Sequence, residues 1–284
     1  MTLASFYDEL SERAERVTVG KTACGRNIDL FRFGEGEKRT LLVAGTHARE
    51  WITMVFCAEL VLREYDGQSF DFLPCLNPDG VCLATDGLKS VSDGAICRRL
   101  LKLNGRKKDF SLWKANALGV DINVNFDADW GEGKYNRTEP GPSDCIGREA
   151  ESENETKAAV NVLQNDYALL VSYHSLGEEV YWGYEHNFRH YEEAKAYADK
   201  IGYALKRSEH SCGGLKDYYA LRYDGLGMTV EIGEEKYGHP YPIERTGELL
   251  QKHEGTLTFL TTLGEKIYDK LHGKGDGGSG KGVS

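Results

Sequence analysis

The chain has 284 residues, and its 40% hydrophobic and 28% charged residues are typical of a folded globular protein rather than a disordered one. The formal net charge of −10 argues against a nucleic acid or an anionic membrane as a partner, because both attract basic surfaces. We find no apolar segment that would span a bilayer, no N-terminal export signal, and seven cysteines without a CxxC pair, so we expect free thiols and a cytoplasmic protein.

The predicted elements alternate between strands and helices along the chain. In chain order we expect a hairpin at residues 17–34, strands at 39–45, 71–76, 167–175 and 228–233, and helices at 51–65, 152–166, 191–205 and 247–271. This alternation predicts one α/β domain, residues 1–270, with a mixed, mostly parallel twisted sheet and helices on both faces. The Gly-rich residues 271–284 are expected to form a flexible tail. In folds of this class the site gathers at the carboxyl ends of the strands.

A histidine and a glutamate directly follow the strand predicted at 39–45. His47 and Glu50 stand three positions apart in GTHAREWIT, at the start of the helix predicted at 51–65. A sharp turn here would bring both side chains to one point, and histidine nitrogen and carboxylate oxygen are zinc ligands. The alternative, that the two residues only cap the helix, is equally compatible with this stretch taken alone.

Two other strand ends carry residues suited to the same site. His174 ends the strand predicted at 167–175, at the sheet edge where His47 and Glu50 are expected. A lone strand-end histidine is usually structural, but two such sites in one sheet favour a metal. Glu231 lies among apolar residues of a buried strand, which is costly for a carboxylate without a partner or a task. Metal-assisted hydrolysis needs a base, so we expect that role for Glu231 rather than a strand-end carboxylate that reaches solvent.

Five motifs occur in the order and approximate spacing of the zinc carboxypeptidase family, which the chain resembles over residues 17–240. They are GTHAREWIT, LPCLNPDGV, WKANALGVDINVNF, YHS and MTVEIG. The resemblance implies a single α/β domain with one catalytic zinc ion (Zn2+) and water as its fourth ligand. It places the zinc ligands at His47, Glu50 and His174 and the catalytic base at Glu231. It also implies a structural turn beside the site at NPDG, residues 77–80.

The chain departs from the digestive members of this family where they grip the carboxylate of their substrate. Those members use an Asn-Arg pair in GVDxNRN, whereas this chain has GVDINVN, with Asn123 kept and Val124 in place of the arginine. Valine cannot make the two charge-assisted hydrogen bonds that arginine makes with a carboxylate. Arg137 and Arg148 in the following loop are candidate replacements, although a solvated loop position is the preferred interpretation of both.

Two more family positions concern catalysis and substrate. The resemblance implies that Lys114, which follows a tryptophan, steadies the oxyanion, because a lysine stabilises developing negative charge as a point charge. Arg98 and Arg99 are alternatives for this cation. The tyrosine that faces substrate in the family has no clean match here, and its candidates are Tyr218, Tyr219 and Tyr223.

Two segments resemble bacterial peptidases that cut the γ-D-glutamyl–diaminopimelate bond of murein peptides. Their GE-x-x-YW and GG-x-KD-aromatic-aromatic segments match residues 177–182 and 213–219. Through this resemblance we expect substrate binding by Glu178, which would hold an amine of diaminopimelate, and by Asn123, Arg49, Trp182 and Tyr219. Core packing is an equally good interpretation of Tyr181 and Trp182.

Three hypotheses follow for the function. The leading one is a zinc-dependent peptidase that hydrolyses small murein-derived peptides at the γ-D-glutamyl–diaminopimelate bond. The near alternative is a zinc metallocarboxypeptidase that acts on ordinary peptides with altered C-terminal specificity. The distant alternative is a zinc-holding binding protein without turnover, which would not need the carboxylate of Glu231.

Overall fold

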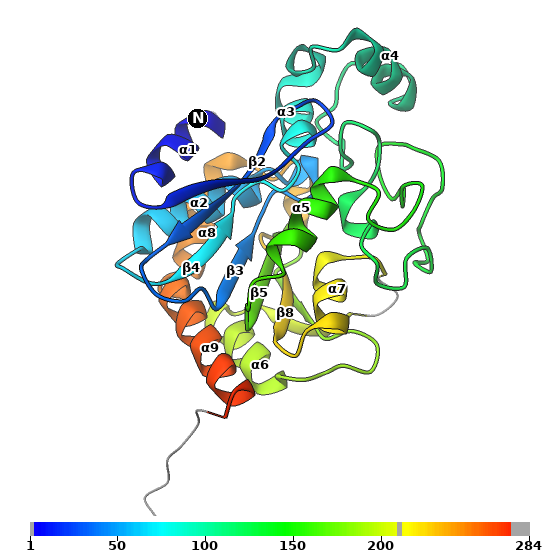
Figure 1. The fold of residues 1–284 in the computed structure, drawn as a ribbon. Helices are drawn as coiled ribbons and strands as arrows, with labels where there is room; N and C mark the ends of the chain where they lie inside the picture. Colours follow the sequence, from blue (N-terminus) through cyan, green and yellow to red (C-terminus); the bar gives the residue numbers. More distant parts are fainter. Residues whose placement is uncertain (1–2, 209–211, 274–284) are drawn as a thin grey trace, which may run out of the picture.

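One mixed sheet organises the computed structural model, which describes residues 3–208 and 212–273 (Figure 1). Within these residues the strand order is β1-β2-β4-β3-β5-β8-β6-β7. The strands are β1 (Glu15–Lys21), β2 (Asn27–Phe33), β3 (Thr40–Val43), β4 (Phe70–Leu73), β5 (Leu169–His174), β6 (Glu179–Trp182), β7 (Ala204–Arg207) and β8 (Leu226–Glu231). Strands β4, β3, β5 and β8 run parallel, while β2 beside β4 and β6 beside β8 are antiparallel. The predicted mixed, mostly parallel sheet is confirmed.

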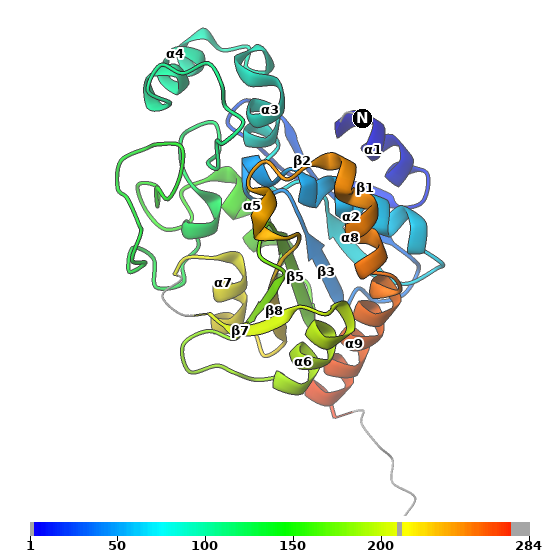
Figure 2. The ribbon, with the colours of Figure 1, turned by 180° about the vertical axis from the view of Figure 1, so that it is seen from behind.

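Helices cover both faces of this sheet, as Figures 1 and 2 show from opposite sides. One face packs against α1 (Leu3–Ser11), α2 (Ile52–Glu64), α6 (Tyr191–Ile201), α8 (Thr246–Lys252) and α9 (Thr256–Leu271). The other face packs against α5 (Asn154–Val162) and α7 (Leu215–Arg222). Beyond the sheet, α3 (Pro78–Asp86) and α4 (Gly94–Leu103) share a smaller core around Trp113.

The central strands are short and apolar because both of their faces are covered. Every residue of β3 and β5 is buried, as expected for parallel strands between two helical layers. The predicted hairpin is β1 and β2, which pair antiparallel, and Gly25 supplies the positive φ of 83° that its turn requires. These central strands fix the positions of the residues that follow them.

The closing helix predicted at residues 247–271 is two helices. α8 ends at Lys252 and α9 begins at Thr256, with Gly255 between them at a φ of 68°. The Glu64 carboxylate accepts hydrogen bonds from the backbone N–H groups of Gly255 (2.7 Å) and Leu257 (2.8 Å). A distant side chain therefore caps α9, which the local pattern could not reveal.

Several elements were not predicted from the sequence. They are α1, α3, α4, α7, β6 and β7. The segment expected as a turn at 77–80 opens α3: the Asn77 side chain accepts from the backbone N–H of Gly80 at 3.0 Å, and Pro78 occupies the first turn. The helix predicted at 191–205 ends at Ile201, and its last residues belong to β7.

Three further expectations concern the chain as a whole. All seven cysteines are free thiols, and Cys57, Cys75 and Cys145 are buried. Across the described part of the chain, every helix is too short or too polar to cross a membrane. The expected tail, 271–284, lies outside the described residues from residue 274 on.

Candidate metal centre and active site

A tight turn after β3 positions the first two candidate ligands. The chain leaves the strand through Gly45, whose φ is 62°, and enters a short 3₁₀ helix, Ala48–Glu50. The Thr53 hydroxyl accepts a hydrogen bond from the Gly45 N–H (3.1 Å) and donates one to the Glu50 carbonyl (2.8 Å). This hydroxyl bridges the two ends of the turn, so that His47 and Glu50 face the same point.

His174, at the carboxyl end of β5, completes a cluster of three buried ligand groups. The His47 Nδ1 atom lies 2.9 Å from a Glu50 carboxylate oxygen and 3.1 Å from the His174 Nδ1 atom. The His174 Nδ1 atom lies 3.2 Å from the other Glu50 oxygen. The three predicted zinc ligands are thus brought together, and one ligand atom from each lies within 4.8 Å of the others.

The spacing and chemistry of this cluster fit a zinc ion. Tetrahedral zinc with bonds of about 2 Å holds two ligand atoms roughly 3.3 Å apart, close to the separations found here. Two imidazole nitrogens that face each other at 3.1 Å also need a proton or a cation between them, since lone pairs repel. His47, Glu50 and His174 could therefore hold one metal ion.

Other buried groups orient the two histidines. The His47 Nε2 atom lies 3.3 Å from Asp121, whose other carboxylate oxygen is 2.7 Å from the Lys114 ammonium. The His174 Nε2 atom lies 3.1 Å from the Ser172 hydroxyl. In metal sites such outer partners fix which ring nitrogen faces the ion, and here they leave Nδ1 of both rings for it.

The charges around His47 control its protonation. Burial lowers the pKa of His47, but the negative charges of Glu50 and Asp121 outweigh burial and raise this pKa to about 8. Burial also opposes ionisation of Glu50, yet His47 and His174 hold its pKa well below the ordinary value. Glu50 is thus a carboxylate, and a cation that displaces the proton of His47 meets its negative charge.

Glu231, the predicted base, ends β8 beside the cluster. The register of β5 and β8 pairs His174 with Glu231, and Glu231 and Thr229 share one face of the strand. Burial, together with the negative charge of Glu50, raises the pKa of Glu231 to about 8. A carboxylate with a raised pKa is a better proton acceptor than an exposed one, as a base in hydrolysis requires.

A cavity of about 460 Å³ opens beside Glu231. Its lining includes Lys114, Asn123, Val124, Tyr181, Lys216, Thr229 and Glu231. The Asn123 side chain also accepts a hydrogen bond from the N–H of Leu215 at 3.1 Å, which ties its loop to the start of α7. The cavity is therefore lined by three residues predicted for the site, Lys114, Asn123 and Glu231. It is also lined by Val124, which replaces the family arginine.

The other predicted substrate-binding residues lie elsewhere. The side chain of Arg49 is about 29% exposed, and its Nε atom lies 4.0 Å from Glu50. Glu178 pairs with Lys252 of α8. Trp182 is buried against Phe188 and Tyr191, and Tyr219 is buried with its hydroxyl donating to the Tyr167 carbonyl at 2.7 Å. Of these four, none is among the described residues that line the cavity.

Of the basic side chains predicted to bind the substrate carboxylate or the oxyanion, only Lys114 is among the described residues that line the cavity. Arg148 is 78% exposed on its side chain and pairs with Glu149, and Arg99 donates to the Leu118 carbonyl. The described residues that line the cavity include none of the four arginines, Arg98, Arg99, Arg137 and Arg148. Lys114 is there, with partners Asp121 and Asp144 (3.3 Å).

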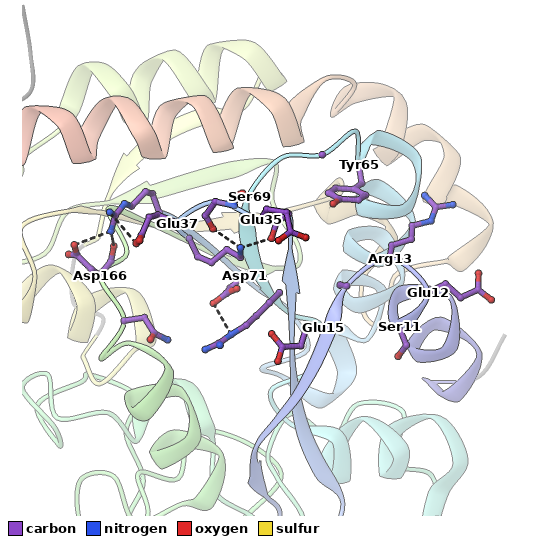
Figure 3. Close-up of a pocket in the computed structure, with 18 residues that line it drawn as sticks. Ser11, Glu12, Arg13, Glu15, Glu35, Glu37, Tyr65, Ser69, Asp71 and Asp166 are labelled. Carbon is purple, nitrogen blue, oxygen red and sulfur yellow. Dashed lines mark hydrogen bonds and ion pairs between the residues drawn. The ribbon is translucent and has the colours of Figure 1, made fainter.

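A larger cavity, about 1010 Å³, lies at the opposite end of the sheet, where β3 and β5 begin (Figure 3). Some of the charged side chains that line it pair with one another: Arg39 with Asp166 (3.0 Å) and Glu37 (3.4 Å), and Arg32 with Asp71 (3.9 Å). Because the ligand cluster found among the described residues lies at the other end of the sheet, beside Glu231, the cavity there is the candidate active site.

Some residues of the site had no role in the sequence-based prediction. Asp121 and Ser172, which contact the two histidines, are the main ones. Tyr181, for which a family motif and core packing were weighed, lines the cavity. Asp121 lies inside a motif quoted above, but its contact with a histidine 74 positions away has no local signal. Ser172 shares a strand face with His174, so the period of two could have suggested it.

Comparison with known proteins identifies the family. Residues 2–244 match the family model described as zinc carboxypeptidase. The chain is 29% identical over 260 residues to gamma-D-glutamyl-L-diamino acid endopeptidase 1 of Lysinibacillus sphaericus, an alignment that covers 84% of this chain but only 64% of that protein.

Two solved structures share the fold. Thrombin activatable fibrinolysis inhibitor has a TM-score of 0.71 at 18% identity, over 93% of this chain and 71% of that one. Murein-tripeptide amidase MpaA from Escherichia coli O157 has a TM-score of 0.58 at 21% identity, over 90% of this chain and 94% of that one. These two likenesses concern the fold, and the match over residues 2–244 gives the conclusion: the chain belongs to the zinc carboxypeptidase family.

Proposed function

We propose that this zinc peptidase hydrolyses murein-derived peptides at the γ-D-glutamyl–diaminopimelate bond, with His47, Glu50 and His174 as the zinc ligands and Glu231 as the general base. The observation that carries the proposal is the wall of the cavity beside Glu231, where Val124 stands in place of the arginine of the digestive members. The relative from Lysinibacillus sphaericus, which is named for cleaving γ-D-glutamyl-L-diamino acids, supports this choice of substrate.

The side chains divide the work of hydrolysis. A bound zinc ion supplies Lewis acidity, which polarises a carbonyl group and makes water easier to deprotonate. Glu231 takes the proton from the attacking water and delivers it to the leaving amine, because it ends β8 beside the ligand cluster and lines the same cavity. Lys114 faces the same cavity, and Asp121 and Asp144 hold its ammonium in place beside the developing oxyanion.

The apolar wall formed by Val124 argues for an unusual substrate. An exopeptidase that takes ordinary peptides must hold a free carboxylate next to the scissile bond, and an arginine does so with two parallel hydrogen bonds. Val124 offers neither charge nor donor, and Arg137 and Arg148 are not among the described residues at the cavity. A substrate recognised through groups farther from the scissile bond suits this wall better.

A metallocarboxypeptidase for ordinary peptides is the second candidate. Asn123, the other half of the family's carboxylate grip, is kept and lines the cavity. Asparagine alone, however, supplies one neutral donor, which binds a carboxylate much more weakly than a guanidinium group.

Product analysis tests the proposal. The zinc-loaded protein is incubated with a murein tripeptide that ends in γ-D-glutamyl–diaminopimelate, and mass spectrometry identifies the products. We expect free diaminopimelate and the remaining dipeptide, loss of activity on chelation, and recovery with zinc. Release of a residue from the other end, or an intact tripeptide, would overturn the proposal.

A further inference from the structure

A basic segment projects from one end of this otherwise acidic molecule. Residues 98–108 lie in α4 and in the turn that follows it, and in Figures 1 and 2, seen from opposite sides, α4 lies at the outer edge, beyond α3 and away from the sheet. This segment has no acidic residue and six basic ones, all exposed, which we call the basic patch: Arg98, Arg99, Lys102, Arg106, Lys107 and Lys108. The rest of the chain has a formal charge of −16, which these six bring to the −10 of the whole.

The fold holds this segment in place. The apolar side of α4 packs through the buried Leu100 on the small core around Trp113, so the charged side of the helix faces solvent. After the helix, the Asn104 side chain donates hydrogen bonds to the carbonyls of Lys107 (3.1 Å) and Asp109 (2.8 Å), which ties the turn together. The basic patch is therefore part of a folded surface rather than of a free loop.

The protein itself supplies no counter-ion for the basic patch. The nearest basic residues before and after it, Lys89 and Lys114, form ion pairs with Asp86 and Asp121. None of the six patch residues forms an ion pair with any residue that the structure describes. Two of the six stand four positions apart on the helix, where like charges repel and cost the helix stability. The stability of the fold therefore does not account for the patch.

A surface that carries many negative charges is the partner that complements six exposed cations. Clusters of about four to eight lysines and arginines are typical of binding to acidic phospholipids, because each cation near the headgroups adds to the attraction. The acidic remainder of the molecule opposes such binding, but exposed charges are screened over about 10 Å at 0.1 M salt. Because the basic patch lies at one end of the molecule, it can meet a membrane surface while the sheet stays farther away.

Two neighbouring features favour a lipid surface over a nucleic acid. Leu112, just after the patch, is 61% exposed, and such a side chain can enter the headgroup region of a bilayer but gains nothing from phosphate groups. The aromatic residues on either side of it, Phe110 and Trp113, are buried, so they offer no ring on which a base could stack.

We propose that the basic patch docks this protein on the surface of membranes that contain acidic phospholipids, with Leu112 at the edge of the contact. Docking of this kind is peripheral and needs no helix that crosses the bilayer. It is also independent of the substrate proposed above, because no patch residue is among the described residues that line the active-site cavity.

Flotation with lipid vesicles tests the proposal. The zinc-loaded protein is mixed with vesicles of phosphatidylcholine alone, or of phosphatidylcholine and phosphatidylglycerol in equal parts, and the bound fraction is measured. We expect binding to the acidic vesicles only, at about 0.1 M salt, and release at about 0.5 M salt, where exposed charges are screened more strongly. The triple variant Arg106→Gln, Lys107→Gln, Lys108→Gln should bind the acidic vesicles roughly 100-fold more weakly, since each cation near the surface contributes about fivefold.

The matched control is the triple variant Arg63→Gln, Lys157→Gln, Lys266→Gln, which removes the same charge from exposed positions of α2, α5 and α9. It should bind the acidic vesicles as the wild type does. Zinc content and circular dichroism verify that both variants are folded, so the result does not depend on which peptide the enzyme cleaves.

Three results would overturn the inference: a wild type that leaves the acidic vesicles unbound, equal binding to neutral and acidic vesicles, and equal effects of the two triple variants. A duplex DNA oligomer is tested at the same salt concentration by fluorescence anisotropy. A wild type that binds this duplex but not the vesicles would assign the basic patch to a nucleic acid instead.

Discussion

At the scale of single residues, the Asp121 side chain contacts both a candidate metal ligand and a lysine of the cavity. Its buried carboxylate lies 3.3 Å from His47 and 2.7 Å from Lys114. Burial raises the pKa of this carboxyl, but Lys114 and His47 outweigh burial and hold the pKa far below its ordinary value. Asp121 is thus an anion that contacts both the candidate metal ligand His47 and the lysine that lines the candidate active-site cavity.

For Asp121→Asn we expect zinc affinity to fall roughly 10- to 100-fold, the usual cost of losing a partner that orients a histidine ligand. Competition with a chromogenic chelator measures this affinity. Asp144→Asn is the control, because it removes an acidic partner of Lys114 and leaves the contact between Asp121 and His47 in place. An unchanged affinity in the Asp121 variant would show that His47 needs no such partner.

Glu231→Gln separates zinc binding from chemistry. The amide keeps the size of the side chain but cannot accept a proton, so we expect full zinc content and a kcat lower by roughly 10²–10⁴-fold. Glu179→Gln is a matched control, since Glu179 lies opposite Glu231 in the β6–β8 register. A Glu231 variant with near wild-type turnover would remove this residue from the mechanism.

At the scale of elements, α5 holds a buried acid whose charge costs stability. Burial, with the charges of Glu153 and Asp79 added, raises the pKa of Glu155 from 4.5 to about 7. Between these values the folded protein keeps a proton that the unfolded chain has lost. Stability from this group is therefore present below about pH 4.5 and is lost as the pH rises to about 7, by an amount on the order of 3 kcal/mol.

Glu155→Gln removes this titration. At about pH 5 we expect the variant and the wild type to have similar Tm values. At about pH 8 the variant should have the higher Tm, because only the wild type then buries an ionised carboxylate. Thermal unfolding at the two pH values measures the effect. A wild type and variant whose Tm values change in parallel would contradict the raised pKa.

The elements predicted from the sequence are those whose pattern is set by burial in the centre of the molecule. The runs that became β3 and β5 are largely apolar and buried at every position, and α2 follows β3 after the turn that contains the 3₁₀ helix Ala48–Glu50. Strands β6 and β7 have only four residues each, which is too short for a period of two to stand out from the flanking sequence. The start of α9 is capped by Glu64, which lies 191 positions before Gly255, and no local signal in the sequence indicates this.

At the scale of the whole molecule, parallel strands bring the site together. β3, β5 and β8 are neighbours in the sheet, and the residues at or after their carboxyl ends include His47, Glu50, His174 and Glu231. Strand-end positions and residue types predicted that His47, Glu50 and His174 lie together, as they do, and the role of Glu231 as the base stays a prediction. The cavity walls come from loops, β6, β8 and α7, and their packing has no local signal in the sequence. Glu178, Trp182 and Tyr219 are not among the described residues that line the cavity, and their part in substrate binding stays a prediction.

The central claim, a zinc peptidase adapted to γ-D-glutamyl–diaminopimelate rather than to ordinary C-termini, is tested most directly at Val124. We measure kcat/KM on a murein tripeptide and on an ordinary dipeptide with a free C-terminus, for the wild type and for Val124→Arg. The wild type should strongly favour the murein tripeptide, and the added arginine should shift the preference toward the ordinary peptide by roughly 1.5–3 kcal/mol, or damage the native activity without gain. A wild type that favours the ordinary dipeptide would contradict the account and leave a plain carboxypeptidase in its place.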